Sequence, residues 1–293
     1  MATDQGPVVQ SALLRSELTR LRTGKGLTQE KVAHSLDWHP SKLIRIEGGK
    51  SNITVTDLRA LLNEYDVRSE SRRDRLERLA RGARQRGWWN DYRDAVDEGT
   101  LQYAGYLTGS SGIRHFQNAV VPGPLQTRAY GQVLTSNYVE GSAVDRKVQF
   151  RSQQQKELEQ REEPPRRFYV LDEAVIRREV GVRRDPNIMP DQLRYLADLA
   201  EEKELITIRI VPFSAGAYAG MEGPFVLLEF DGGAPDLLYL EAPSARQGQS
   251  AITSDETTVT DYRSAFEAIL DEALPSAESI SLLREVADQL MRG

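Results

Sequence analysis

Side chains that can bind a nucleic acid gather in one short stretch of the sequence, between residues 29 and 50. Arginine and lysine can donate hydrogen bonds to guanine, and serine or histidine can contact base edges or phosphate groups. A glutamine at the start of a helix can hold a phosphate together with the N-terminus of that helix. The residues with this chemistry are Gln29, His39, Ser41, Lys42, Arg45 and Lys50.

Two short helices joined by a tight turn are expected to position these side chains. Thr28 is predicted to be the N-cap of the first of them, and Asp37 occupies the turn. Pro40 suits the first position of the next helix, where its missing N–H costs nothing. Leu43 and Ile46 lie three residues apart in this helix and face the core, which turns Ser41, Lys42 and Arg45 outward, where they can reach a major groove.

Further helices are expected on both sides of this pair. A first helix carries leucines at helical spacing and ends at Gly24 or Gly26, and a fourth is capped by Thr54 or Thr56. An arginine-rich fifth helix is predicted from Glu70 to Arg84. Residues 1–85 are therefore predicted to form an all-α domain of five helices, with a core at residues 11–68 and the fifth helix as the connection.

The segments LTQEKVA, HPSKLIRIEGGK and ITVTDLRALLNEYDV resemble the xenobiotic-response-element (XRE) family, which shares its fold with phage repressors and Cro. The resemblance implies a helix-turn-helix domain in which Gln29 contacts phosphate, while His39, Ser41, Lys42 and Arg45 contact bases or phosphate. Pro40 departs from the common pattern, because a polar residue often contacts bases at that position. Glu47 is interpreted as structural, paired with an arginine of the first helix.

The formal charge of the chain changes sign near the end of the predicted all-α domain. Residues 1–90 hold 17 Lys and Arg against 11 Asp and Glu, a formal charge of +6, whereas the remainder carries −12. A basic surface attracts nucleic acid, and an acidic one attracts basic partners. The asymmetry supports a DNA-binding head and an acidic body.

The body, residues 86–293, changes to short segments rich in β-branched and aromatic residues. RFYVLDEAVI, ITIRIVPF, PFVLLEF and DLLYLEA predict four strands of one sheet. Helices are expected between and after them, at 144–163, 189–203, 262–273 and 279–291. The fold class is therefore predicted to be α+β, with an all-α head and a larger α+β domain whose sheet is antiparallel.

The order of VVPGPLQTRAY, LDEAVIRREVG, IRIVPFSAGAYAGMEGPFVLLEF, LLYLEA and the final paired helices resembles a domain of unknown function that follows XRE-type heads in actinobacterial regulators. The resemblance covers residues 86–291. It implies an antitoxin-like regulator, often encoded beside a small partner protein.

Catalytic and metal sites are not expected. The chain has no Cys, and of its three His only His115 lies in the body, so a base or a metal ligand has few candidates. No phosphate-binding or dinucleotide-binding motif is present. Asp172 and Glu173 are adjacent, so on a strand they would point to opposite faces. We expect no enzymatic activity, no cofactor and no metal.

The sequence also lacks an apolar run that could span a bilayer, so we expect no membrane association and a cytoplasmic location, at the nucleoid when bound to DNA. The leading interpretation is a homodimeric transcriptional regulator that binds double-stranded DNA at an inverted repeat. One alternative is an antitoxin-like protein that sequesters a small basic protein encoded nearby and autoregulates its operon. The other is a small-ligand sensor with a glycine-rich loop around Tyr218 and Met221 over a pocket.

Overall fold

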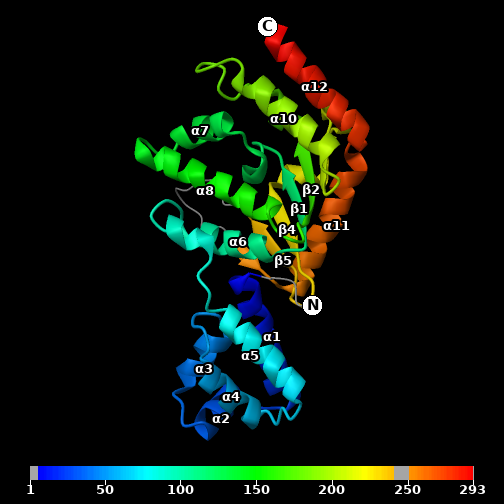
Figure 1. Cartoon of the computed structure of the whole chain (residues 1–293). Coiled ribbons are helices and arrows are strands. Elements are labelled where there is room, and N and C mark those ends of the chain that lie inside the picture. Colours follow the sequence, from blue (N-terminus) through cyan, green and yellow to red (C-terminus); the bar gives the residue numbers. More distant parts are fainter. Residues whose placement is uncertain (1–5, 241–250, 293) are drawn as a thin grey trace. The chain divides into compact units, whose positions relative to one another are not determined.

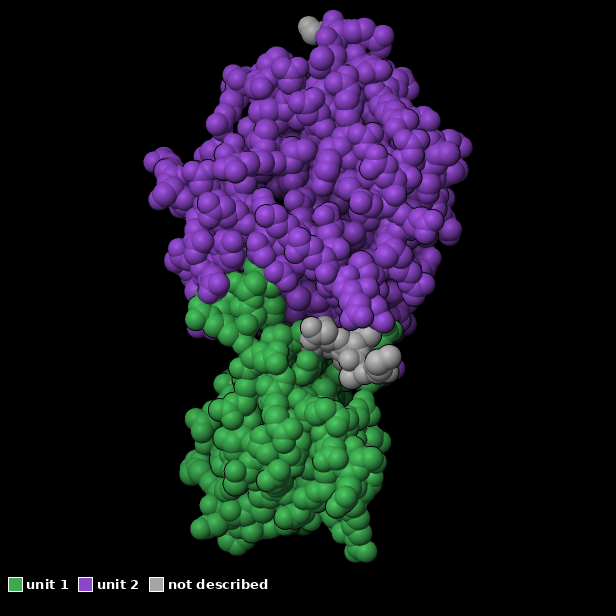
Figure 2. Space-filling model, in the orientation of Figure 1, with its two compact units in different colours: residues 1–90, 230–235 green, residues 91–229, 236–293 purple. Residues whose placement is uncertain are grey.

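The computed structural model describes residues 6–240 and 251–292, which form two compact units (Figures 1 and 2). The first unit contains residues 1–90 and 230–235, and the second contains residues 91–229 and 236–293. The sequence-based division between residues 85 and 86 did not place residues 230–235 with the first unit.

Helices build the first unit, in the order that the sequence predicts. They are α1 (Pro7–Gly24), α2 (Gln29–Ser35), α3 (Pro40–Glu47), α4 (Val55–Glu64) and α5 (Glu70–Gly82), followed by the short helix η1 (Trp88–Tyr92). Thr28, Thr54 and Ser69 cap α2, α4 and α5, because each side-chain oxygen accepts a hydrogen bond from a first-turn N–H. The first helix starts earlier than its leucine pattern shows, with Pro7 at its first position.

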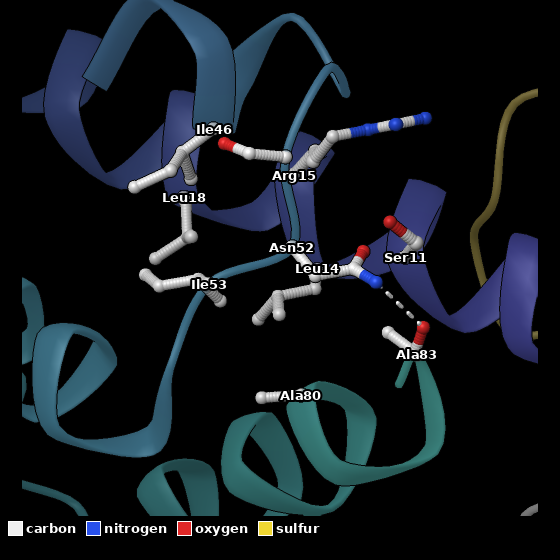
Figure 3. Close-up of a pocket in the computed structure, with 10 residues that line it drawn as sticks. Ser11, Leu14, Arg15, Leu18, Ile46, Asn52, Ile53, Ala80 and Ala83 are labelled. Atoms are coloured by element: carbon white, nitrogen blue, oxygen red, sulfur yellow. Dashed lines mark hydrogen bonds between the residues drawn. The ribbon is translucent and has the colours of Figure 1, made fainter. Parts of the chain in front are cut away.

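The core of the first unit lies between α1, α3, α4 and α5. Its fully buried side chains include Leu18, Leu43, Leu58 and Leu62. Figure 3 shows a crevice beside this core, lined by residues of α1, of the end of α5 and of the segment that joins α3 to α4. Asn52 donates a hydrogen bond from its amide to the Ala83 carbonyl, 3.2 Å away, and so fastens that segment to the end of α5.

The second unit is built on a mixed sheet of six strands in the order β3-β2-β1-β4-β5-β6, counted over the described ranges. The strands are β1 (Gly112–Gln117), β2 (Arg166–Asp172), β3 (Ile206–Val211), β4 (Phe225–Glu229), β5 (Leu237–Leu240) and β6 (Ala251–Thr253). The β1–β2 and β2–β3 pairs are parallel, and the other three pairs are antiparallel.

The expectation of an antiparallel sheet is thus wrong for two strand pairs. Parallel neighbours need a crossover connection of about a dozen residues or more, usually helical. The connection from β1 to β2 contains α7 (Arg128–Ser136) and α8 (Ser142–Glu159). The connection from β2 to β3 contains α9 (Glu173–Arg177) and α10 (Ile188–Glu202). These helices make the parallel pairing possible. The sequence analysis also did not predict the strands β1 and β6.

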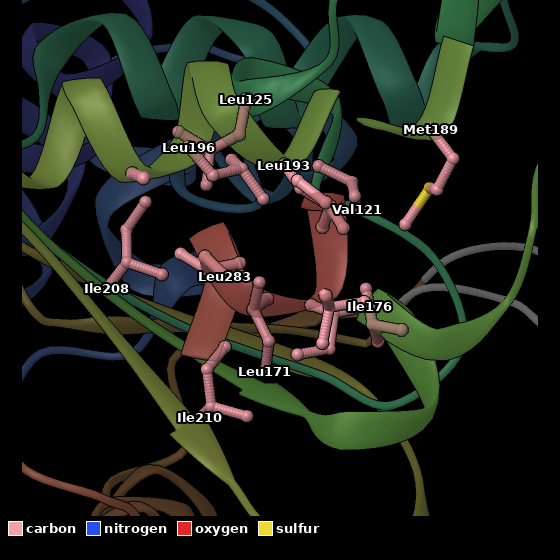
Figure 4. Close-up of a cluster of buried hydrophobic side chains, with 14 of the residues drawn as sticks. Val121, Leu125, Leu171, Ile176, Met189, Leu193, Leu196, Ile208, Ile210 and Leu283 are labelled. Atoms are coloured by element: carbon pink, nitrogen blue, oxygen red, sulfur yellow. The ribbon is translucent and has the colours of Figure 1, made fainter. Parts of the chain in front are cut away.

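Helices cover both faces of the sheet (Figure 1). On one face, α10 packs against α12 (Ser276–Arg292) over β3, and α6 (Glu98–Gly109) and α8 lie beside the other strands. On the opposite face, α11 (Glu256–Glu272) packs against β3, β4 and β5. The larger of the two resulting cores contains Leu171, Ile208, Leu193 and Leu283, which point toward one another in Figure 4.

The outer edge of β3 is closed by the start of α12. The backbone N–H of Ile210 donates to the Ser279 hydroxyl at 3.0 Å, and the N–H of Leu274 donates to the Ile210 carbonyl at 2.8 Å. These bonds use backbone groups that an exposed edge strand would leave available for pairing with another chain.

The adjacent carboxylates at residues 172 and 173 have structural tasks. Asp172 ends β2 and caps α9, and it also accepts a hydrogen bond from the Tyr218 hydroxyl. Glu173 belongs to α9 rather than to a strand, where it accepts a hydrogen bond from the Phe213 backbone N–H and pairs with Arg177. The expectation that both lie on one strand is therefore corrected, because the strand ends between them.

Candidate DNA-binding surface

A tight turn joins α2 to α3 in the first unit. Asp37 adopts a φ of +54° in this turn, and the Trp38 N–H donates to the Ala33 carbonyl at 2.8 Å. Aspartate tolerates this left-handed conformation better than most residues. The turn therefore sets the angle at which α3 leaves α2, as a helix-turn-helix arrangement requires.

A buried network holds α3 against α1 and α2. Glu47, at the end of α3, accepts two hydrogen bonds from Arg22 of α1, at 2.8 and 2.9 Å, and one from the Gln29 amide at 2.7 Å. The Arg22 and Glu47 side chains are only 12% and 5% exposed. The prediction that Glu47 pairs with an arginine of the first helix is confirmed.

Gln29 is consequently placed differently from what the sequence suggested. Its amide nitrogen faces Glu47 in the network, so the side chain helps to orient α3. Gln29 is also the first residue of α2, whose first-turn backbone N–H groups are the ones that can hold a phosphate. Phosphate contact at Gln29 stays a prediction, and this geometry favours its backbone over its side chain.

The outer face of α3 carries Ser41, Ile44 and Arg45. Successive helix positions differ by about 100°, so these three residues lie opposite Leu43 and Ile46, which are buried. Arg45 is exposed, and its side chain forms no hydrogen bond or ion pair with any residue that the structure describes. Its five N–H donors are therefore available to an external partner.

Ile44 is the residue on this face that the sequence analysis missed. Its side chain is 50% exposed, although it lies in the middle of a helix whose other large apolar residues are buried. The spacing from Leu43 and Ile46 predicts its outward direction, but its apolar type alone does not indicate a contact with DNA. Apolar side chains in a major groove can contact the methyl group of thymine.

Lys42 lies at the side of α3 rather than on its outer face. Its ammonium group is 2.7 Å from an Asp57 carboxylate oxygen at the start of α4 and 3.9 Å from the centre of the Trp38 ring. An ammonium held by a carboxylate and an aromatic face is less available to DNA than a free one. We therefore rank Lys42 below Arg45 as a contact.

The N-terminus of α3 is closed by His39. Nδ1 of the imidazole accepts a hydrogen bond from the Ser41 N–H at 3.3 Å and lies 2.8 Å from the Ser41 hydroxyl. Pro40 occupies the first helical position, as predicted. His39 and Ser41 are thus brought together and hold the end of α3 that would enter a groove first.

The C-terminus of α3 follows the glycine pattern of the sequence. Gly49 has a φ of +75°, the Gly49 N–H donates to the Ile46 carbonyl, and the Lys50 N–H donates to the Arg45 carbonyl. This pair of bonds is a Schellman motif, which needs a left-handed residue. Lys50 is exposed just beyond this motif.

Within residues 6–240 and 251–292, no group of three His, Asp or Glu is arranged to hold a metal ion. Over the same ranges, none of the helices is long and apolar enough to cross a bilayer.

Two protein families match the chain. A family described as a helix-turn-helix domain matches residues 13–76, which confirms the predicted class of the N-terminal domain. A family described as domain of unknown function DUF5753 matches residues 100–285, within the range for which such a domain was predicted. No curated protein and no solved structure matches. With more than half of its length matched, the chain belongs to the DUF5753 family and carries a helix-turn-helix domain at its N-terminus.

Proposed function

We propose that the protein is a sequence-specific transcriptional regulator of the XRE type that binds an inverted repeat in double-stranded DNA as a homodimer, with a non-catalytic acidic body. The observation that carries the proposal is the outer face of α3, where Arg45 is exposed and without a partner among the described residues. The Arg22–Glu47–Gln29 network supports it, because a contact surface must be rigid to discriminate between sequences.

The three outer residues of α3 have complementary chemistry. The Arg45 guanidinium matches the paired acceptors of guanine, and the Ser41 hydroxyl can contact base or phosphate. Ile44 would contact a thymine methyl group between them. His39 and Lys50 flank this face and would contact phosphates, which position the helix without specifying sequence.

A selection of random duplexes by the full-length chain, followed by footprinting upstream of its own gene, tests the proposal. We expect a protected palindrome whose half-sites are about 34 Å apart, one helical turn of DNA. Arg45→Ala is expected to weaken selective protection at physiological salt, by roughly 1 to 3 kcal/mol of binding free energy.

Arg78→Ala is the matched control for this experiment. Arg78 is an exposed arginine of α5, and like that of Arg45 its side chain forms no ion pair or hydrogen bond with the described residues. Its removal lowers the net charge by the same amount but leaves α3 intact. Equal loss from both variants, or no sequence-selective protection by the unmodified chain, would contradict the proposal.

A second candidate function is favoured by charge. Residues 91–293 carry a formal charge of −12, which would attract a small basic protein and repel DNA. In this antitoxin-like function, the body sequesters a partner encoded by a neighbouring gene, and DNA binding serves autoregulation. Co-expression with that gene product and size-exclusion chromatography test it, and separate elution at low and physiological salt would refute it.

A further inference from the structure

Three buried polar atoms lie without a hydrogen-bond partner on one face of the sheet in the second unit. They are Nδ1 of His115, Nε of Arg167 and the Tyr169 hydroxyl. Among the described residues one other buried side-chain atom shares this condition, the Tyr65 hydroxyl in the first unit. Most buried polar atoms in proteins are hydrogen-bonded, so three exceptions at one place need an explanation.

Sheet geometry places the three residues side by side. Arg167 and Tyr169 are two residues apart on β2 and so face the same side. His115 is opposite Tyr169 in the parallel register of β1 and β2, and the two ring centres are 5.8 Å apart. Tyr169 belongs to the core beneath α10, where Tyr195 also packs. The cluster therefore lies between the sheet and its helical cover.

Arg167 is the member that most needs a partner. The residue is 6% exposed, and its guanidinium forms no ion pair or hydrogen bond with any residue in the described ranges. Its charge acts on the neighbouring hydroxyl groups of Tyr169 and Tyr195, and burial raises the pKa of both hydroxyls. Buried charges in proteins are normally paired, because an unpaired one carries a large desolvation penalty.

Two partly buried arginine side chains of the described residues are satisfied by the protein itself. Arg22 binds Glu47, and Arg209 donates to the Leu274 carbonyl at 2.7 Å and to the Ala273 carbonyl. Water could complete the hydrogen bonds of His115 and Tyr169, but water does not neutralise a guanidinium. The group that fits this cluster is a negatively charged acceptor.

We propose that His115, Arg167 and Tyr169 form a binding site for the carboxylate or phosphate group of a small molecule. The guanidinium of Arg167 would bind the anion through its forked donors, as it does in bidentate recognition of carboxylate and phosphate. The Tyr169 hydroxyl would donate a further hydrogen bond, and His115 would contact the same group or its neighbour on the ligand. This site is separate from the glycine-rich loop that the sequence suggested for a ligand, and it does not depend on DNA binding.

Nuclear magnetic resonance of the full-length chain can observe this site directly. The protein has three histidines, so the imidazole C2–H signal of His115 is assigned by comparison with His115→Gln. Sodium phosphate and sodium acetate are the probes, each titrated against sodium chloride at the same ionic strength. We expect the His115 signal to shift and saturate with one or both probes, while the signal of His34, which is exposed and outside both proposed sites, reports unspecific effects of salt. Saturation with phosphate alone indicates a phosphate-bearing ligand, and saturation with acetate alone indicates a carboxylate.

Arg167→Met removes the charge and keeps the length of the side chain. We expect it to weaken half-saturation at His115 by about tenfold or more, the effect of one charge-assisted hydrogen bond. Arg166→Met is the matched control, because Arg166 is the preceding and exposed residue of β2. Arg167→Lys, which keeps the cation without the fork, should retain saturation but at higher phosphate concentration, and it serves if the methionine variant does not fold.

Thermal unfolding gives a second measurement. Phosphate or acetate should raise the melting temperature of the unmodified chain and of Arg166→Met by the same amount, and should not raise that of Arg167→Met. In the absence of either anion, Arg167→Met should melt at the same or a higher temperature than the unmodified chain. A His115 signal that does not saturate with either probe, or that saturates equally in Arg167→Met, would overturn the proposal.

Discussion

The two units treat a buried arginine in opposite ways. In the first unit, Arg22 donates to Glu47 at 2.8 Å and to the Leu27 carbonyl at 2.8 Å. In the second unit, Arg167 is at least as buried and has no acceptor among the described residues. The first arginine holds helices together, whereas the second is available to a ligand. Two arginines that are buried to a similar degree therefore have different roles. The role depends on whether the protein itself provides an acceptor for the guanidinium group.

The same substitution at both positions should separate these roles most widely. Arg22→Met leaves the buried Glu47 carboxylate without its cation, and we expect a loss of about 3 to 5 kcal/mol of unfolding free energy in the first unit. Arg167→Met should cost nothing or stabilise the second unit. Urea unfolding followed by tryptophan fluorescence measures the effect of Arg22→Met, because all three tryptophans lie in residues 38–89 of the first unit. The effect of Arg167→Met on the second unit is measured in the same titration by far-ultraviolet circular dichroism. Equal destabilisation by the two variants would remove the distinction.

Acid should affect the second unit at a higher pH than the first. Burial lowers the pKa of His115 from 6.5 to about 3, so between these values the unfolded state binds one proton more than the folded state. Stability then falls as pH decreases below 6.5, by about 1.4 kcal/mol per pH unit. His115→Gln should remove this dependence, as measured by urea unfolding of the second unit at pH 6.5 and at roughly pH 5.

Carboxylates dominate the acid response of the first unit instead. Burial alone would raise the pKa of Glu17, but hydrogen bonds from Arg72 and Arg20 lower it below the usual 4.5. A lowered carboxylate pKa contributes stability above the unfolded value, and that contribution is lost as pH falls below it. Tryptophan fluorescence should therefore show little change in the first unit's stability from this carboxylate between pH 6.5 and 5. Parallel losses in the two units, both abolished by His115→Gln, would contradict this difference.

Arg45→Ala should weaken specific DNA binding by roughly 1 to 3 kcal/mol and relax the preference at one base pair of each half-site. Lys42→Ala should weaken it less, because Asp57 and Trp38 already hold that ammonium group. Fluorescence anisotropy with the selected operator measures both affinities, and Arg166→Ala in the second unit is the control. A larger effect from Lys42 than from Arg45 would show that the DNA contacts the side of α3 rather than its outer face.

The smallest expected effect concerns Ile44. Replacing one thymine of each half-site by deoxyuridine removes only a methyl group, and we expect a loss of about 0.8 kcal/mol at the position that Ile44 contacts. Ile44→Ala should lose affinity for the thymine operator and become insensitive to the replacement. If the unmodified chain binds the operator but no position is sensitive to deoxyuridine, the role of Ile44 fails while the proposed function stands.

Local sequence was sufficient for most of the first unit. Thr28 caps α2 through a bond to a residue three positions away, and Pro40 needs no N–H at the first position of α3, so their types predicted where these helices begin. The outward direction of Ser41 and Arg45 followed from the buried spacing of the same helix. Gln29 was less predictable, because its partner Glu47 lies eighteen residues away.

The second unit shows the limit of the same reasoning. Short apolar segments predicted that strands exist, but β1 is followed by nearly fifty residues before its parallel neighbour β2. Periodicity within a strand does not indicate which strand lies beside it or in which direction. The parallel pairs and the short strand β6 were missed for this reason.

By itself, the sequence determined the two-part organisation, the helix-turn-helix domain and the face of α3, because each depends on residue type and spacing within a few helical turns. Only the tertiary structure decided that Arg166 is exposed while Arg167 is buried beside Tyr169 and His115. Two adjacent arginines are equivalent in sequence, and the alternation of a strand places one on each face. Which face is covered by helices depends on contacts between segments far apart in the chain. The burial of Arg167, for which we propose an anionic partner, depends on the same contacts.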